Sequence, residues 1–468
     1  MLNKFKNWKD NIAFAKNSYN AGIVTLVLII VIIANMMLQQ VAGTSMQIDL
    51  SDSNVYEISE TSETLVSELD CEISFTVIAV EEYIDEMVVN FIDKYTEMSD
   101  KISLEWIDPI LYPSALETYN TTENTIVITN ESTGKSTTVA ITDILYQDEM
   151  SYYYYGETII EFDGDGLFTS AIYQVTNAVE YKIYNVTGHS EQSFSAGIED
   201  LMTKNNVVIE ELNLLTATEI PEDCDLLTIY SPENDITADE KTLVSDYLAT
   251  GGDAMILYSE SAPSTPNLDE LLLDYGLEKA DGYIADLERA YQGNGYYLIP
   301  YLTISGDMAI DITSESVLVI NTLGFTETTP IRDTISVSTF MKTSAQGLAV
   351  TADAEVTGEF ILGAVASETI TAEDGTTDDA RLTVYGGANI INSTITDQFV
   401  SLDNVQLFMN SVMANFENST NISIEAKVIE ESYNVVSDPN LYSLLFIIII
   451  PLTVIFAGLV VWLQRRKR

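Results

Sequence analysis

The sequence predicts an α/β protein in which two membrane-spanning helices flank a two-lobed region. Three observations predict this class. Strand and helix patterns alternate through the middle of the chain, a long uncharged apolar stretch lies near each end, and basic residues gather beside those two stretches. The chain has 468 residues, and domains typically hold about 100–200. More than one domain is therefore expected.

The two apolar stretches are long enough to cross a bilayer. Residues 17–48 and 439–464 contain no charged side chain, and a helix needs about 20 apolar residues to span the hydrocarbon. We predict transmembrane helices at 21–42 and 441–463, because a helix satisfies its own backbone in lipid. A cleaved signal peptide is the alternative for the first stretch, with Val41-Ala42-Gly43 as a weak cleavage site.

The charge distribution predicts the orientation in the membrane. The formal net charge is −52, and eight of the 20 Lys and Arg lie in the first 16 and the last four residues. By the positive-inside rule, the tails 1–20 and 464–468 are cytoplasmic and the acidic bulk is extracytoplasmic, at the cell membrane. Such acidity excludes nucleic acid as a partner, since binding it requires Lys and Arg. Solubility outside the cell is the simplest interpretation of the charge.

Residues 43–150 are predicted to form a thioredoxin-like α/β domain. A strand, a helix, a second strand, a short helix and a hairpin follow one another, in the ranges 71–80, 81–98, 101–110, 113–119 and 124–141. The lobe has no Cys-x-x-Cys, so redox chemistry is not indicated. Cys71 and Cys224 are predicted to be two separate, mostly buried thiols, with a disulfide between them as the alternative, and no spacing of residues indicates a metal site.

A linker at 151–167 is expected to lead to a flavodoxin-like domain at 168–416. Within the linker, "DGDG" at 163–166 is predicted to be a turn, because the spacing and distal Glu of a calcium loop are missing. Repeated βα units predict a doubly wound, mostly parallel sheet. Thr237 and Glu240 should form a capping box at the start of one of its helices. A second linker, 417–440, leads to the second span.

Four segments of the second domain resemble a known family. They are "YNVTGHSEQSF" (184–194), "DCDLLTIYSPENDITADEKTLVSDYLATGGDAMIL" (223–257), "RLTVYGGANIINS" (381–393) and "NVQLFMNSVMAN" (404–415). Their order and spacing resemble those of the gliding-motility-associated ABC-transporter auxiliary proteins, which are substrate-binding-like and contain an intraflagellar-transport-type α/β domain. Ser190 replaces the second Gly of the family's Gly-His-Gly-Glu, and Gly386-Gly387-Ala388-Asn389 replaces its Gly-Asp-Ser turn.

The resemblance implies a non-catalytic, membrane-anchored auxiliary subunit of an ABC transport system, without a cofactor. Its implied partners are permease and ATPase chains, membrane lipid around the two spans, and a substrate or envelope protein. The chain has no Gly-x-x-x-x-Gly-Lys-Ser/Thr, so it is not expected to bind nucleotide itself. Two spans are also too few for a permease.

The candidate contact residues lie at predicted strand ends, where ligands gather in open α/β sheets. They include the single histidine of the chain and are Gly188, His189, Glu191, Ser231, Pro232, Tyr258 and Gly386. For His189 three interpretations remain open: a structural turn, a contact with a ligand or partner, and catalysis. No catalytic residue and no metal ligand is predicted.

Two other functions remain as alternatives. One is a membrane-anchored ectoenzyme that hydrolyses envelope polymers with His189, although no Gly-x-Ser-x-Gly elbow is present. The other is a cell-surface structural protein with a glycosylated exterior. It is based on six Asn-x-Ser/Thr sites, at Asn120, Asn130, Asn185, Asn392, Asn418 and Asn421.

Overall fold

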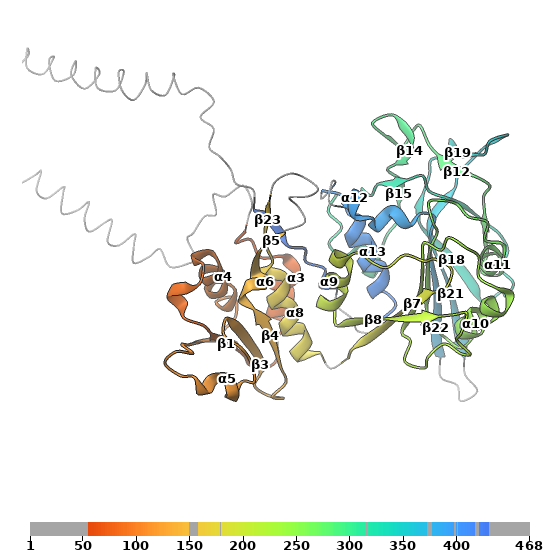
Figure 1. The fold of residues 1–468 in the computed structure, drawn as a ribbon. Helices are drawn as coiled ribbons and strands as arrows, with labels where there is room; N and C mark the ends of the chain where they lie inside the picture. The colour runs from red at the N-terminus through yellow and green to blue at the C-terminus, as the bar shows by residue number, and fades with distance from the viewer. Residues whose placement is uncertain are drawn as a thin grey trace, which may run out of the picture.

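The computed structural model describes residues 55–148, 158–177, 179–314, 316–371, 377–396, 399, 401–416 and 421–429. The predicted α/β class is confirmed, and two lobes follow each other along the chain (Figure 1). The predicted transmembrane helices 21–42 and 441–463 both lie outside the described residues. Within the described part, no helix has the length and apolar character needed to span a membrane.

The first lobe contains the elements up to residue 176 and one strand from the end of the described chain. They are α3 Glu60–Ser67, β1 Ile73–Ile78, η2 Glu81–Tyr83, α4 Glu86–Thr96, β2 Ile102–Ile107, α5 Ser114–Thr118, β3 Thr125–Asn130, β4 Ser136–Ala140, α6 Ile141–Ile144, β5 Leu145–Asp148, β6 Ile159–Phe162, α8 Gly164–Thr176 and β23 Lys427–Ile429.

The core of the first lobe lies between a four-stranded sheet and two helices. The strand order is β2-β1-β3-β4, with β1 parallel to β2 and antiparallel to β3. Helix α4 begins where the Asp85 carboxylate accepts a hydrogen bond from Met87 N at 2.8 Å. Phe91 of α4 and Phe168 of α8 both pack in this core, and Phe168 meets Phe75 of β1 edge-on at a centroid distance of 5.4 Å.

Helix α8 belongs to the first lobe, which differs from the predicted start of the second domain at 168. Its apolar residues Phe168, Ile172 and Val175 are buried in the first-lobe core. The predicted turn at 163–166 is in fact the first turn of this helix. A Cβ on Gly164 would lie 2.7 Å from the Phe91 ring, so a glycine allows the close approach. The predicted linker 151–167 therefore includes the strand β6 and the start of α8.

The second lobe contains the elements from residue 181 to residue 413. They are β7 Tyr181–Thr187, α9 Ala196–Lys204, β8 Val207–Asn213, β9 Leu226–Tyr230, α10 Ala238–Ala249, β10 Ala254–Leu257, α11 Pro266–Asp274, β11 Leu277–Lys279, β12 Tyr283–Ala285, β13 Ala290–Tyr291, β14 Asn294–Leu298, β15 Tyr301–Leu302, η3 Gly306–Ala309, β16 Val319–Ile320, β17 Phe325–Glu327, β18 Ile335–Lys342, β19 Gly347–Val350, β20 Glu355–Gly358, β21 Ile361–Thr371, β22 Thr377–Tyr385, η4 Ala388–Ile391, α12 Ser393–Thr396 and α13 Asn404–Met413.

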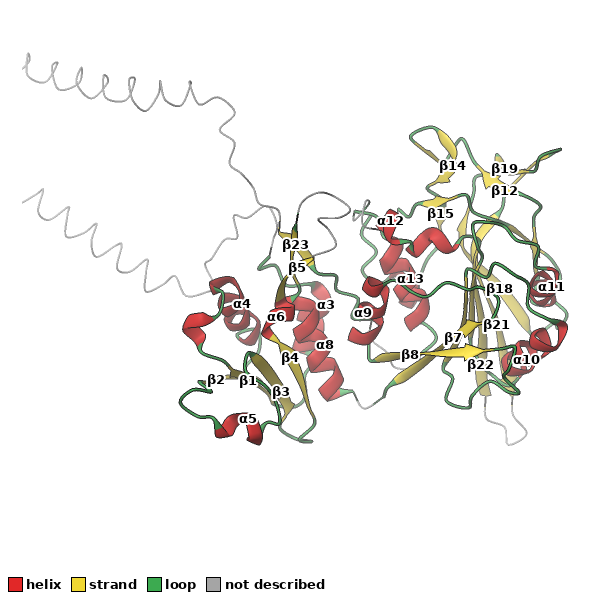
Figure 2. Ribbon diagram, viewed as in Figure 1, coloured by secondary structure: helices red, strands yellow, loops and turns green. Residues whose placement is uncertain are grey.

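One half of the large sheet is parallel and covered by helices on both faces. The strands β8, β7, β9, β10 and β22 lie side by side in this order and run in the same direction. Helices α9 and α13 pack on one face, and α10 and α11 on the other (Figure 2). Successive residues of a strand therefore pack in different cores, one on each face of the sheet, as Ile183 and Tyr184 of β7 do. This arrangement is doubly wound, as predicted.

The other half of the sheet is antiparallel, so the predicted mostly parallel sheet is wrong for this part. Strand β21 pairs antiparallel with β22, and β17, β18 and β11 continue the antiparallel pairing. Only residues 372–376 separate β21 from β22 along the chain. A parallel pair needs a crossover of about a dozen residues or more. The short connection therefore requires the antiparallel arrangement.

The two ends of the described chain lie together on the first lobe. Val55 is buried in its core, and β23 pairs antiparallel with β6, with Lys427 opposite Phe162. The Lys427 ammonium also donates a hydrogen bond to the backbone carbonyl of Glu57. The chain thus leaves the first lobe after α8, forms the second lobe, and returns to its starting point.

A buried ion pair joins the two lobes. The Lys204 ammonium at the end of α9 is 3% exposed, and it lies 2.7 Å from the Asp163 carboxylate, which precedes α8. It also lies 2.9 Å from Asp200 and donates to the carbonyl of Ile424 at 3.1 Å. Burial alone lowers the pKa of Lys204, but the two carboxylates outweigh it and hold that pKa above its ordinary value.

Replacement of Lys204 is expected to loosen the junction of the lobes. In Lys204→Met the Asp163 carboxylate stays buried without its partner, and breaking such a pair costs about 3 kcal/mol. Hydrogen exchange of the α8 and α9 amides should report this loss as a lower opening free energy.

Lys182→Met is the matched control, because this lysine pairs with Asp223 and Glu210 at the surface. Its loss should cost much less, because exposed ion pairs contribute little to stability. Adding Asp163→Asn to Lys204→Met should recover part of the stability. Equal effects of the two lysine variants would contradict the assigned role of Lys204.

Candidate functional site

The carboxyl edge of the parallel strands contains a topological switch point. After β7 the chain crosses to β8 on one side, and after β8 it crosses back to β9 on the other side of β7. The loops that follow β7 and β9 therefore diverge. In open α/β sheets such a divergence leaves a crevice in which ligands bind. This edge holds the residues predicted from the sequence.

The two loops at this point use left-handed backbone conformations. The φ angles are +126° at Gly188, +61° at Ser190 and +56° at Ser231. The left-handed region favours glycine, and other residues occupy it at a cost. Ser190 is the position at which the family pattern has its second glycine, so its φ angle gives a physical reason for that glycine. The surrounding hydrogen bonds hold the strained turns in place.

His189 connects the β7 loop to helix α10. Its side chain is buried, with Nδ1 3.1 Å from Glu191 Oε1 and Nε2 3.1 Å from Glu240 Oε2. Glu240 also accepts a hydrogen bond from Thr237 N at 2.7 Å, and Glu240 N donates to the Thr237 hydroxyl. The predicted capping box is thus confirmed. Its glutamate has a second partner, the histidine, which comes 51 positions earlier in the chain.

The backbone of His189 joins the β7 loop to the β9 loop. Its amide donates to Glu191 Oε2 at 2.6 Å, and its carbonyl accepts from the amides of Glu233 and Asn234, both at 3.1 Å. Gln192 N donates to Tyr230 O at the end of β9. Side chain and backbone together therefore fix three neighbouring segments at the switch point.

This geometry holds the neighbouring loops together. Both ring nitrogens are already occupied. Among the nearby hydroxyls, Ser195 Oγ accepts from Ile198 N to cap α9, and Ser190 Oγ lies 3.5 Å from the Asn234 amide group.

The other predicted contact residues lie along the same edge. Ser231, Pro232, Tyr258 and Gly386 are buried, whereas Gly188 is exposed. Backbone hydrogen bonds connect neighbours along the edge, from Ser231 N to Leu257 O and from Tyr258 N to Tyr385 O. The candidate residues predicted from the sequence are thus neighbours along this edge of the sheet. Their side chains mostly face the protein interior, as the Tyr258 hydroxyl does when it donates to Asp269 at 2.9 Å.

Gly386 allows two backbone segments to approach closely. A Cβ at this position would lie 2.1 Å from the carbonyl oxygen of Leu323. Asn389, in the turn that departs from the family's Gly-Asp-Ser, donates from its amide to the Ile320 carbonyl and to Glu260 Oε2. This part of the edge holds the sheet to the segment 320–323.

Three of the six Asn-x-Ser/Thr sites have buried asparagine side chains, namely Asn130, Asn185 and Asn421. Asn185 lies within β7, and its side-chain oxygen accepts a hydrogen bond from Thr228 at 2.9 Å. A glycan cannot be accommodated on a side chain that packs inside the sheet. Asn418 lies outside the described residues.

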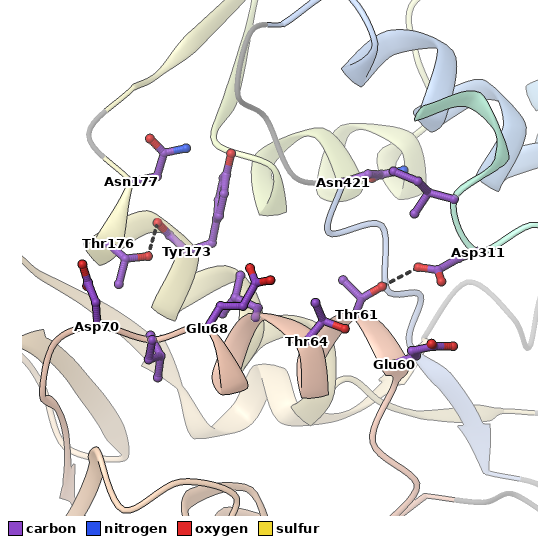
Figure 3. A pocket seen from close by; sticks show the side chains of 13 residues that line it. Glu60, Thr61, Thr64, Glu68, Asp70, Tyr173, Thr176, Asn177, Asp311 and Asn421 are labelled. Atoms are coloured by element: carbon purple, nitrogen blue, oxygen red, sulfur yellow. Dashed lines mark hydrogen bonds between the residues drawn. The ribbon is translucent and has the colours of Figure 1, made fainter. Parts of the chain in front are cut away.

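A cleft between the lobes was not predicted from the sequence. Its volume is about 530 Å³, and Figure 3 shows residues of both lobes around it. The lining residues come from four separate segments and are Glu60, Thr61, Thr64, Leu65, Glu68, Leu69, Asp70, Tyr173, Thr176, Asn177, Ile310, Asp311 and Asn421. The Thr61 hydroxyl donates to the Asp311 carboxylate and so connects the lobes across the cleft.

Cys71 and Cys224 are both free thiols, as predicted. Burial raises the pKa of Cys224 to about 11, which disfavours a reactive thiolate at neutral pH. Within the described ranges, no group of three or more His, Cys, Asp and Glu is placed to hold a metal ion.

Loss of the His189 ring is expected to loosen the switch point. In His189→Ala two buried carboxylates lose their partner, and we expect a loss of about 3 kcal/mol in local opening free energy. His189→Gln should lose less, because its amide can still donate to one carboxylate. Hydrogen exchange in residues 188–192 and 233–240 measures this effect. Unchanged exchange in His189→Ala would contradict the connecting role of the ring.

Comparison with solved structures finds partial likenesses in fold. The N-terminal domain of mmIFT52 is 16% identical with a TM-score of 0.35, covering 49% of this chain and 95% of its own. A cytoplasmic protein from Salmonella typhimurium is 11% identical with a TM-score of 0.31, covering 53% and 99%. PurLQS from Thermotoga maritima is 10% identical with a TM-score of 0.27, covering 50% and 98%. No function follows from similarity at this level.

Comparison by sequence gives a family for the second lobe. None of the curated proteins compared with the chain matches it. Residues 180–374 match the family described as an ABC-type uncharacterized transport system. The matched segment contains the switch point, the capping box and the parallel strands up to β10. Residues 180–374 of the second lobe are therefore similar to an ABC transporter auxiliary family, as the resemblance of the sequence indicated.

Proposed function

We propose that this chain is a membrane-anchored, extracytoplasmic auxiliary subunit of an ABC transport system and that it has no catalytic activity. Helices at 21–42 and 441–463 anchor it in the cell membrane with both termini in the cytoplasm. Its partners are the permease and ATPase chains of the system, in the manner of gliding-motility-associated auxiliary proteins. The observation that carries this proposal is the family match over residues 180–374.

The path of the described chain supports attachment by two helices. Val55 and β23 both belong to the first lobe, and Lys427 contacts the backbone of Glu57. Residues 43–54 and 430–440 separate these points from the proposed helices in the sequence. Two membrane helices that are connected to neighbouring points of the first lobe can enter the membrane side by side. The first lobe is then nearest to the bilayer.

The strand orders support finer proposals about fold. The order β2-β1-β3-β4, with one parallel and two antiparallel pairings, fits a thioredoxin-like first lobe. The parallel strands of the second lobe follow the order 2-1-3-4-5, which is that of flavodoxin-like sheets. Both fold types carry many unrelated functions, so the functional proposal does not rest on them.

The geometry of His189 supports a role without catalysis. A general base must reach the proton that it removes, and both ring nitrogens face buried carboxylates instead. The ectoenzyme alternative would require this cluster to open. The buried positions of Asn130, Asn185 and Asn421 likewise weaken the alternative of a heavily glycosylated surface protein.

Co-purification tests the proposed assembly. The full-length chain, tagged and extracted in mild detergent, should elute together with an ABC permease and an ATPase, in a fixed ratio. As control, a variant in which residues 21–42 are replaced by an unrelated membrane helix keeps the chain in the membrane. If the extracytoplasmic lobes make the contact, this variant should still co-elute.

One outcome of the co-purification would count against the proposed assembly. Elution of the chain alone, while the permease and the ATPase remain together, would contradict its role as their subunit.

A further inference from the structure

The inter-lobe cleft has the size of a small-molecule site. Its volume is about 530 Å³, within the range of about 300–1,000 Å³ that is usual for such sites, which are often found between domains. Leu65, Leu69 and Ile310 supply apolar surface, and the hydroxyls of Thr61, Thr64 and Thr176 supply hydrogen-bonding groups. A ligand in this cleft would touch both lobes at once.

The charged lining residues are all acidic. Glu60, Glu68, Asp70 and Asp311 line the cleft, and no Lys, Arg or His of the described ranges does. None of these four carboxylates forms an ion pair with a described residue. The positive charge that would balance them is thus missing from the lining.

Two helix C-termini lie at the cleft, and a lysine donates to a carbonyl at each of them. Helix α3 ends at the cleft with C-cap Glu68, and α8 ends there with C-cap Asn177; neither has a basic residue in its last turn. A helix C-terminus carries about half a negative charge and favours cations. Lys101 and Lys135 donate to the carbonyls of Leu69 and Asn177 and so offset part of the negative charge of these two helix ends. Among the residues that the structure describes, the four lining carboxylates have no ion-pair partner.

The carboxylates are spread along the cleft and do not converge. Figure 3 shows Glu60 and Asp311 toward one end and Glu68 and Asp70 toward the other, with Thr61 and Thr64 between them. Eight positions of helix separate Glu60 from Glu68, which is about 12 Å along the axis. A single metal ion requires several oxygens within about 2.6 Å, so this spacing does not suit one. It suits an elongated molecule with a positive charge at each end.

We propose that the inter-lobe cleft binds a linear organic polyamine, with one terminal ammonium between Glu60 and Asp311 and the other near Glu68 and Asp70. The aliphatic chain lies over Leu65, and the threonine hydroxyls accept hydrogen bonds from inner amino groups. Because Asp311 belongs to the second lobe and Glu60 to the first, bound ligand holds the lobes together. That such a ligand is cargo or effector of a transporter rests on the proposed function; its binding to the purified chain does not.

Titration calorimetry with spermidine tests the site on the full-length protein in detergent at near-physiological salt. Saturable binding of one molecule per chain is expected. Glu60→Gln with Glu68→Gln should weaken it by about tenfold, because one charge is removed at each end. Both side chains are exposed, so the fold should be retained.

Two controls separate a built site from general attraction to an acidic protein. Glu219→Gln with Glu222→Gln removes the same charge from an exposed loop elsewhere and should leave the affinity unchanged. Magnesium chloride at equal charge concentration should compete poorly. Absence of saturable binding, equal weakening by the two double variants, or equal competition by magnesium would each overturn the proposal. Failure of co-purification with the permease would leave this result untouched, and the two proposals can thus fail independently.

Discussion

The arrangement of the lobes depends on one buried ammonium group. Lys204 lies where α9 of the second lobe meets the start of α8 and the returning segment at Ile424, and its charge is balanced there by Asp163. An isolated charge in such a place is costly, whereas a paired and hydrogen-bonded one is tolerated. The contact therefore helps to fix how the lobes face each other, together with the Thr61–Asp311 hydrogen bond across the cleft.

The contacts of His189 with Glu191 and Glu240 hold the loops at the carboxyl edge of the sheet. The single histidine was the most conspicuous residue of the sequence, and its ring connects the β7 loop to the cap of α10. Strand ends and the Thr237–Glu240 capping box were predictable because each depends on residues close in sequence. The neighbourhood of the seven candidate residues followed from the parallel strands, since the carboxyl ends of such strands share one edge.

Long-range packing was not predictable from the sequence. The apolar stripe of α8 would suit either lobe, and only the fit of Gly164 and Phe168 against first-lobe aromatics decides between them. One local feature of the sequence indicates the antiparallel half of the sheet, namely the short connection between β21 and β22. The cleft had none, because residues near 60, 175, 310 and 421 share no pattern. It is the folded arrangement that brings Glu68 and Asp311 to one cavity.

The membrane arrangement is most directly tested by cysteine labelling. In full-length protein with Cys71→Ala and Cys224→Ala, single cysteines are introduced as Ser132→Cys, at an exposed hairpin, or as Arg468→Cys. A membrane-impermeant maleimide added to intact cells should label Ser132→Cys at once and Arg468→Cys only after permeabilisation. Labelling of Arg468→Cys in intact cells, or protection of Ser132→Cys, would contradict an extracytoplasmic two-lobed region held by two helices.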